Sequence, residues 1–179
     1  MVDDGLSLDE ALRRVARQHG IQLQHALPPL EALHAAIHDY RELFRPKQLL
    51  QMQEQRRLAV QAMSEFSLFH PKLVGTLLHG DGPLDVIRLL LSADTPEQVM
   101  HHLSDRHIPW QDTEIVLTYS GKRKVARPAM RFLAGETMVE LVVLDHKNKS
   151  DPPRNSLSGG QLEMLDVEQL NALIKQTTG

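Results

Sequence analysis

A glycine-rich turn followed by a carboxylate is the part of this sequence best suited to chemistry. Gly75, Gly80 and Gly82 lie close together between two apolar runs, and Asp85 begins the second run. Glycines let backbone N–H groups approach a phosphate, and a carboxylate beside a strand can bind a divalent cation. The order of strand, glycine turn, carboxylate and strand therefore predicts a site for a nucleoside triphosphate and Mg²⁺.

The spacing of the carboxylates argues against efficient catalysis at this site. Alternate residues of a strand point to the same side, so a second metal ligand is expected two positions after Asp85. That position is Ile87, which cannot bind a metal. If the register is shifted by one residue, the pair becomes Val86 and Arg88, and the arginine would repel a cation.

The segment before the turn is expected to be helical. A capping box at Ser7–Glu10 begins a helix that Gly20 ends, Pro28 and Pro29 open a second helix that Pro46 closes, and a third extends from about Lys47 to Phe66.

The pattern after Pro71 predicts strands together with two helices. We expect strands at Leu73–Leu78, Leu84–Leu91, Glu114–Tyr119, Ala129–Leu133 and Met138–Leu144, a helix that Asp94 caps and that extends to about Arg106, and a last helix at Asp166–Lys175. Gly135 and Glu136 are expected to form a hairpin turn, and Lys147–Gly160 an exposed loop. The order favours an α/β or α+β fold with a mixed sheet.

This order, together with several short motifs, resembles the nucleotidyltransferase superfamily with the polymerase β-like fold. Gly75-Thr76 stands where that family has Gly-Ser, Asp85 near its first aspartate, and Glu140 near its third carboxylate. The phrase Phe69-His-Pro-Lys-Leu-Val-Gly75, the Asp-x-Pro-Glu-x-Val pattern at Asp94–Val99, and Ile108-Pro109 are similar to a bacterial nucleotidyltransferase-like group. The resemblance implies a mixed sheet flanked by helices at 67–179, after an N-terminal helical region at 1–66.

The resemblance also implies roles for individual residues. Gly75 and Thr76 would bind phosphate, Asp85 and Glu140 would hold Mg²⁺, and Lys122 or Arg123 would neutralise the leaving group while a nucleotide is transferred to an acceptor. The active-site motif is degenerate because the second aspartate is replaced. We therefore expect a nucleotide-binding relative with weak or no transfer activity.

Each of these residues also has an ordinary structural interpretation. The glycines could form a hairpin that Pro83 shapes, Asp85 could cap a turn, and Glu140 could lie on a solvated sheet face. The basic cluster Lys122–Arg127 could be a hairpin tip in solvent. The alternative function is a regulatory or protein-interaction domain whose N-terminal helices bind a partner or a second copy of the chain.

Composition excludes several classes of protein. The chain has 179 residues, 41% of them hydrophobic and 24% charged, which is typical of a globular protein. The absence of cysteine excludes disulfides, thiolate metal sites and thiol nucleophiles. A net charge of −3 favours no nucleic-acid partner except through Lys122–Arg127. The acidic N-terminus and the lack of a long apolar run predict a soluble cytoplasmic protein with no membrane partner.

Overall fold

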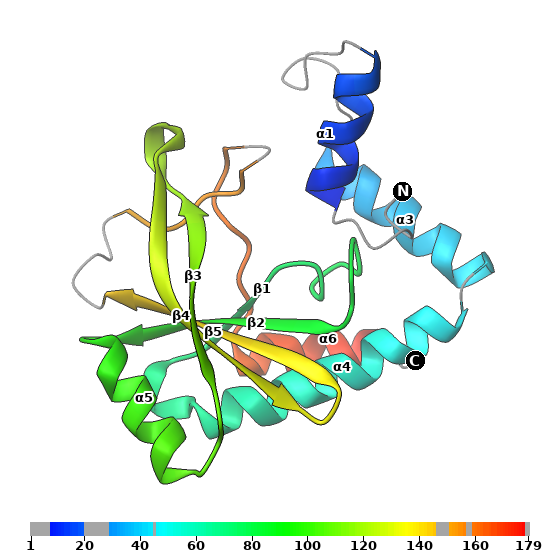
Figure 1. Ribbon diagram of the computed structural model, residues 1–179. Coiled ribbons are helices and arrows are strands. Elements are labelled where there is room, and N and C mark those ends of the chain that lie inside the picture. The colour runs from blue at the N-terminus through cyan, green and yellow to red at the C-terminus, as the bar shows by residue number, and fades with distance from the viewer. Residues whose placement is uncertain (1–7, 20–28, 45, 146–150, 157–158, 178–179) are drawn as a thin grey trace.

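The computed structural model describes residues 8–19, 29–44, 46–145, 151–156 and 159–177 as a mixed five-stranded sheet with helices (Figure 1). The spatial strand order is β1-β2-β5-β4-β3, with bounds β1 Lys72–Val74, β2 Val86–Ala93, β3 Gln111–Thr118, β4 Lys124–Ala134 and β5 Thr137–Asp145. The central pair β2 and β5 is parallel, and every other pair is antiparallel. The predicted α+β class with a mixed sheet is confirmed.

Three helices cover one face of the sheet. They are α4 (Pro46–Glu65), α5 (Pro96–Asp105) and α6 (Val167–Thr177), and α4 and α6 pack side by side (Figure 1). Alternation sends Ile87, Leu89 and Leu91 of β2 toward these helices, where they join the main core. The same core contains Met52 and Met63, so α4 packs with the sheet, although the predicted division at residue 66 places it with the N-terminal helices.

The opposite face of the sheet has a smaller apolar cluster. Val74, Leu90, Leu117, Ala129 and Val142 form this cluster with Tyr119. Leu162 and Met164 pack on it from the segment that precedes α6. The cluster therefore has an irregular cover, and no residue of a described helix packs on it.

The N-terminal helices α1 (Leu8–His19) and α3 (Leu30–Phe44) extend away from the sheet (Figure 1). Pro46 was expected to close the second helix, but it is the first residue of α4. Proline suits a first helical position because that position needs no N–H donor. Ser7, Gly20 and Pro28, which we expected to bound these helices, lie outside the described residues.

The first predicted strand is shorter than expected. β1 ends at Val74 because Gly75 has a φ of 92°, which breaks the extended backbone. The chain then turns, and Leu78 and Gly80 donate backbone N–H groups to the carbonyls of Gly75 and Thr76. Leu77 and Leu78 are core residues of this turn and not of a strand.

A buried arginine of α4 holds this turn against the helix. Arg56 is 3% exposed and donates from Nε to the Leu77 carbonyl at 3.1 Å and from Nη2 to the Leu78 carbonyl. Burial lowers the pKa of Arg56 to about 10, which leaves it charged at neutral pH. The turn is therefore fixed by helix side-chain donors as well as by apolar contacts.

Several other expectations about local structure are confirmed. β1 and β2 are adjacent and antiparallel, and β5 joins the same sheet beside β2. Gly135 and Glu136 connect β4 and β5, with Ala134 opposite Thr137. Asp166 caps α6 by accepting the N–H of Gln169 at 2.9 Å. The N-cap of α5 is Thr95, one residue after the expected Asp94.

Within the predicted loop at Lys147–Gly160, residues 146–150 and 157–158 lie outside the described part of the chain. The described remainder is irregular apart from isolated bridges of Arg154 to Thr118 and Gln161. Through Arg154, the described part of this segment is joined to the end of β3 and to the chain that leads toward α6.

Candidate functional site

A row of charged side chains crosses the middle of the sheet on the face opposite the helices. The register places Arg88 of β2 beside Glu140 of β5, Glu140 beside Arg131 of β4, and Arg131 beside Gln111 of β3. These residues alternate with the core residues of their strands, so they share one face. The row brings two arginines to either side of one glutamate.

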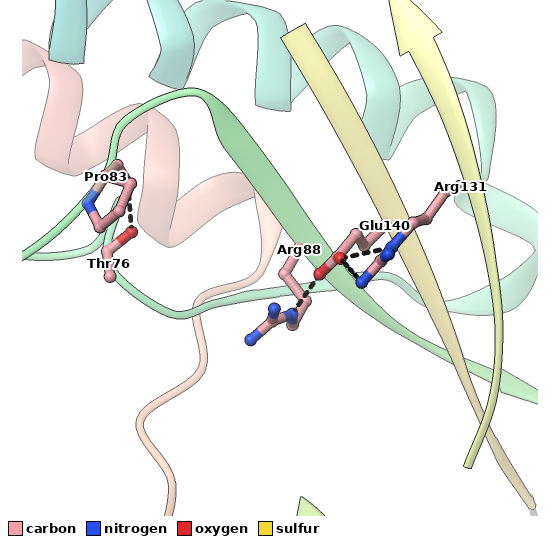
Figure 2. A network of polar contacts seen from close by, with 5 residues as sticks. All are labelled: Thr76, Pro83, Arg88, Arg131 and Glu140. Atoms are coloured by element: carbon pink, nitrogen blue, oxygen red, sulfur yellow. Dashed lines mark hydrogen bonds and ion pairs between the residues drawn. The ribbon is translucent and has the colours of Figure 1, made fainter. Parts of the chain in front are cut away.

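Glu140 is bound by both arginines. Arg88 donates from Nε to Oε2 of Glu140 at 2.6 Å. Arg131 donates from both Nε and Nη2 to Oε1 at 2.7 Å. Figure 2 shows the carboxylate between the two guanidinium groups, with Thr76 and Pro83 in the chain that leads into β2.

The burial of this cluster is uneven. The Glu140 side chain is 4% exposed, whereas those of Arg88 and Arg131 are 38% and 40% exposed. A buried carboxylate is expensive unless it is paired and hydrogen-bonded, and the two arginines supply that pairing. Two positive charges face one negative charge, and Nη1 and Nη2 of Arg88 have no partner among the described residues. The open part of this face therefore has an excess of positive charge.

Gly75 lies beside this cluster, because Val74 pairs with Arg88 and Gly75 follows directly. It is exposed, and a Cβ built on it would meet nothing within 4 Å. Its positive φ, and not the approach of another group, therefore explains the glycine here. Thr76 donates its hydroxyl to the Pro83 carbonyl at 2.6 Å, so the hydroxyl closes the loop before β2.

Asp85 and Glu140 do not form a shared ligand set. Asp85 is exposed one residue before β2, and its carbonyl accepts the Met138 N–H. Continuing the alternation of β2 backwards puts Asp85 on the side of Ile87, opposite to that of Glu140. No group of three or more His, Asp or Glu residues in the described chain is arranged to hold a metal. The geometry gives the predicted Mg²⁺ pair no support, and its metal role stays a prediction.

Lys122 and Arg123 lie at the other end of the sheet. They form the turn between β3 and β4, and Lys124 is seven residues from Arg131 along β4, or about 23 Å at ~3.3 Å per residue. The predicted group of Gly75, Thr76, Lys122 and Arg123 is therefore not one site. Arg123 instead pairs with Asp151 at 2.9 Å and lies over the Tyr119 ring.

A small pocket lies at this second end, where the parallel strands β2 and β5 finish. It has a volume of about 200 Å³, and its lining includes Ser92, Tyr119, Arg127 and Asp145. Arg127 donates from Nε to the Tyr119 hydroxyl at 2.9 Å, and its guanidinium lies 5.1 Å from the centre of the ring. Lys72, also in the lining, pairs with Asp166. Charged side chains of this pocket therefore already have partners, and the partners of Lys72 and Asp151 lie outside the lining.

Comparison with known protein families, curated proteins and solved structures finds no match. No helix among the described residues is long and apolar enough to cross a membrane.

The sequence contains a signal for the arginine cluster that our site prediction did not use. Arg88, Arg131 and Glu140 each interrupt an otherwise apolar run. A charged residue inside an apolar strand needs a partner of opposite charge across the sheet. Two arginines and one glutamate in three such strands can therefore be expected to pair with one another. From the sequence we interpreted Arg88 only as a residue that would repel a metal cation, and not as a ligand-binding group.

Proposed function

We propose that this protein binds a nucleoside triphosphate or a related phosphorylated ligand at the Arg88–Glu140–Arg131 row and transfers nucleotides poorly or not at all. The observation that carries the proposal is the state of Glu140, whose two oxygens are bound by guanidinium groups. A carboxylate in that state orients arginines and has little capacity left for Mg²⁺. The row is thus better suited to grip an anion than to hold a cation.

The chemistry of arginine supports a phosphorylated ligand. Guanidinium groups form charge-assisted, often bidentate, hydrogen bonds to phosphate, and such bonds are roughly twice as strong as neutral ones. Glu140 holds both groups in place before a ligand arrives, which reduces the side-chain entropy lost on binding. Gly75 lies exposed next to Arg88 and leaves the approach free of a side chain.

Titration with ATP followed by amide NMR shifts tests this proposal. We expect shifts at Gly75, Arg88 and Arg131 with ATP in EDTA as well as with Mg²⁺-ATP, and weaker shifts with adenosine. Arg88→Gln and Arg131→Gln should each weaken ATP binding about tenfold, since a charged hydrogen bond contributes about 1.5–3 kcal/mol.

The matched control is Arg57→Gln, which removes an exposed arginine of α4, on the helix-covered side. It should leave ATP affinity unchanged. Equal weakening by all three variants would indicate attraction to net charge alone, and the absence of shifts with ATP in either buffer would contradict the proposal.

Transfer activity requires a separate assay. The full chain is incubated with labelled ATP, CTP, GTP and UTP in Mg²⁺ or Mn²⁺, and both self-labelling and RNA acceptors are scored. We expect no incorporation, because Ile87 stands where a second metal ligand is needed and metal stabilisation of the transition state contributes several kcal/mol. Robust incorporation that Asp85→Ala abolishes would make Asp85 a metal ligand and reject the inactive assignment.

A second proposal is protein binding through the N-terminal helices. The observation that favours it is the extension of α1 and α3 beyond the sheet (Figure 1). Part of α3 is already used internally, since His34 lies 3.3 Å from Asp81 and stacks on His79. Sedimentation equilibrium of the full chain tests the dimer form of this proposal, and a monomer at all concentrations would reject a homodimer.

A further inference from the structure

We propose that the outer edge of β3 binds an extended peptide segment that has basic side chains at alternate positions and adds as an antiparallel sixth strand. This surface is separate from the arginine row, and the proposal does not depend on nucleotide binding. Three features of β3 carry it: outward backbone groups at Asp112–Val116 that no described residue pairs, a repeated acidic side chain, and a groove beside the strand.

The outer edge of β3 has backbone groups that no described residue pairs from Asp112 to Val116. β3 is the last strand of the sheet, and among the described residues it pairs with β4 and, at Thr118, with Arg154 in an isolated bridge. Tyr119 donates its N–H inward to the Arg123 carbonyl, whereas Thr118 accepts the Arg154 N–H at 2.7 Å from outside the hairpin. In an antiparallel ladder the backbone groups of alternate residues point outward. Asp112, Glu114 and Val116 therefore present N–H and C=O groups to an incoming strand.

The side chains of the same three residues give the edge a chemical pattern. Asp112, Glu114 and Val116 are all exposed to solvent, and the exposed fraction of Val116 is 59%. Asp112 accepts the Trp110 indole N–H at 3.3 Å, and Glu114 has no partner among the described residues. The edge thus offers acid, acid and an apolar side chain at every second position.

An open groove of about 420 Å³ lies beside this edge, between β3, β4 and α5. Its lining combines the two acidic residues with Met100 of α5 and Pro128 and Met130 of β4. Side chains of an added strand that lie opposite Asp112 and Glu114 would share their face of the sheet and reach this groove. The aliphatic stems of lysine or arginine suit Met100 and Pro128, and their charged ends suit the carboxylates.

Charge complementarity decides the occupant. Strand addition gives affinity through backbone bonds and specificity through alternate side chains, so the partner must carry basic residues two apart. Because the added strand runs antiparallel, its apolar residue comes first and the two basic residues follow. A second copy of β3 would place its own Asp112 and Glu114 near the same two carboxylates. These like charges repel one another, so the edge favours a basic peptide over pairing with another β3.

Fluorescence anisotropy with the full chain tests this site. The probe is a labelled Thr-Val-Thr-Lys-Thr-Lys-Thr peptide with blocked ends, and the control is Thr-Val-Thr-Thr-Lys-Lys-Thr, which has the same composition with adjacent lysines. We expect saturable binding of the probe that weakens with salt, and at least fivefold weaker binding of the control. Equal binding of the two peptides would overturn the proposal.

Two further changes separate backbone pairing from simple attraction of charge. Val116→Pro removes an outward N–H without removing a β3–β4 hydrogen bond, so it should abolish peptide binding while urea unfolding remains cooperative. Should that variant fail to fold, a probe with N-methyl groups on both lysines gives the same test on the unchanged protein. Tight binding of the methylated probe would reject strand addition.

Glu114→Gln should weaken binding of the probe peptide two- to fivefold, as expected for the loss of an exposed ion pair. Its control is Glu54→Gln, which removes an exposed carboxylate of α4. The same loss in both variants would contradict a role for the β3 edge. Sedimentation velocity of the protein alone tests the remaining alternative, which is self-association. If the protein is a dimer and Val116→Pro is a monomer, the β3 edge binds a second copy of the chain, and the peptide proposal is rejected.

Discussion

The two faces of the sheet differ in how they are covered and in what they expose. On the helix-covered face, Ile87, Leu89 and Leu141 are fully buried under α4, α5 and α6. On the opposite face the neighbouring positions of the same strands include Arg88 and Glu140. The difference shows that alternate positions of β2 and β5 serve two purposes. One set makes the main core, and the other makes the smaller apolar cluster and the charged row beside it.

The covers explain this division. Three amphipathic helices can bury a continuous apolar face, whereas the described segment before α6 covers only part of the other side. The uncovered part is where the charged row lies, with arginines that remain about 40% exposed. We infer that the helix-covered face contributes most of the folding stability and that the open face is available for ligands.

The largest expected effect comes from truncating a residue of the helix-covered face. Leu141→Ala should lower the free energy of unfolding by about 2–5 kcal/mol, because it removes a fully buried side chain and leaves a cavity. Urea denaturation measures the loss. The matched variant is Val142→Ala, one residue further on β5 and on the other face, which should cost about 2 kcal/mol or less. A larger loss for Val142→Ala would contradict the division between the faces.

An intermediate effect is expected for the charged row. Glu140→Gln should lower the free energy of unfolding by about 2 kcal/mol, since it weakens hydrogen bonds from two charged donors to a buried acceptor. The triple variant Arg88→Leu, Glu140→Leu and Arg131→Leu should recover most of this loss, because apolar replacement of a whole ion cluster is often neutral or stabilising. The same variant should lose ATP binding.

This pair of results separates stability from function at the row. A triple variant that unfolds more readily than Glu140→Gln would mean that the cluster is needed for the fold. A triple variant that is stable and still binds ATP would show that the row is not part of the ATP-binding site.

The smallest expected effect concerns Asp166, which links the two faces by capping α6 and pairing with Lys72. Asp166→Ala should cost about 1 kcal/mol at pH 7, the usual value for losing an N-cap. The Gln169 backbone N–H, with Lys72 adding to it, holds the pKa of Asp166 below its usual range. The ionised carboxylate is therefore favoured in the folded state.

The pH dependence of this variant follows from that direction. A carboxyl with a lowered pKa in the folded state stabilises above its unfolded pKa of about 3.9, and the contribution is lost as pH falls below it. The difference in unfolding free energy between the protein and Asp166→Ala should thus be constant from pH 5 to 7 and decrease toward pH 3. Asp166→Asn keeps a capping oxygen without the charge, so its difference from the protein should be smaller, and it should also decrease toward pH 3 because neither variant has the titrating carboxyl.

Much of the local structure follows from the sequence because its causes are local. The alternating and apolar runs predicted the strand pairs β1–β2 and β4–β5, the Gly135-Glu136 turn joined the expected strands, and Asp166 capped the expected helix. Errors occurred where tertiary contacts decide. Leu77 and Leu78 are apolar enough for a strand, but the φ of Gly75 and the donors of Arg56, 21 residues earlier, make them a turn.

The candidate site depended mainly on tertiary structure. The sequence singled out Glu140 through a family resemblance, Lys122–Arg127 as a basic cluster, and Ile87 as the residue that breaks the metal pair. They could not indicate that Lys122 and Arg123 lie at the opposite end of the sheet from Gly75, because strand register sets that distance. Nor could they pair Glu140 with Arg88, 52 residues away, since that contact exists only once β2 and β5 lie parallel and in register.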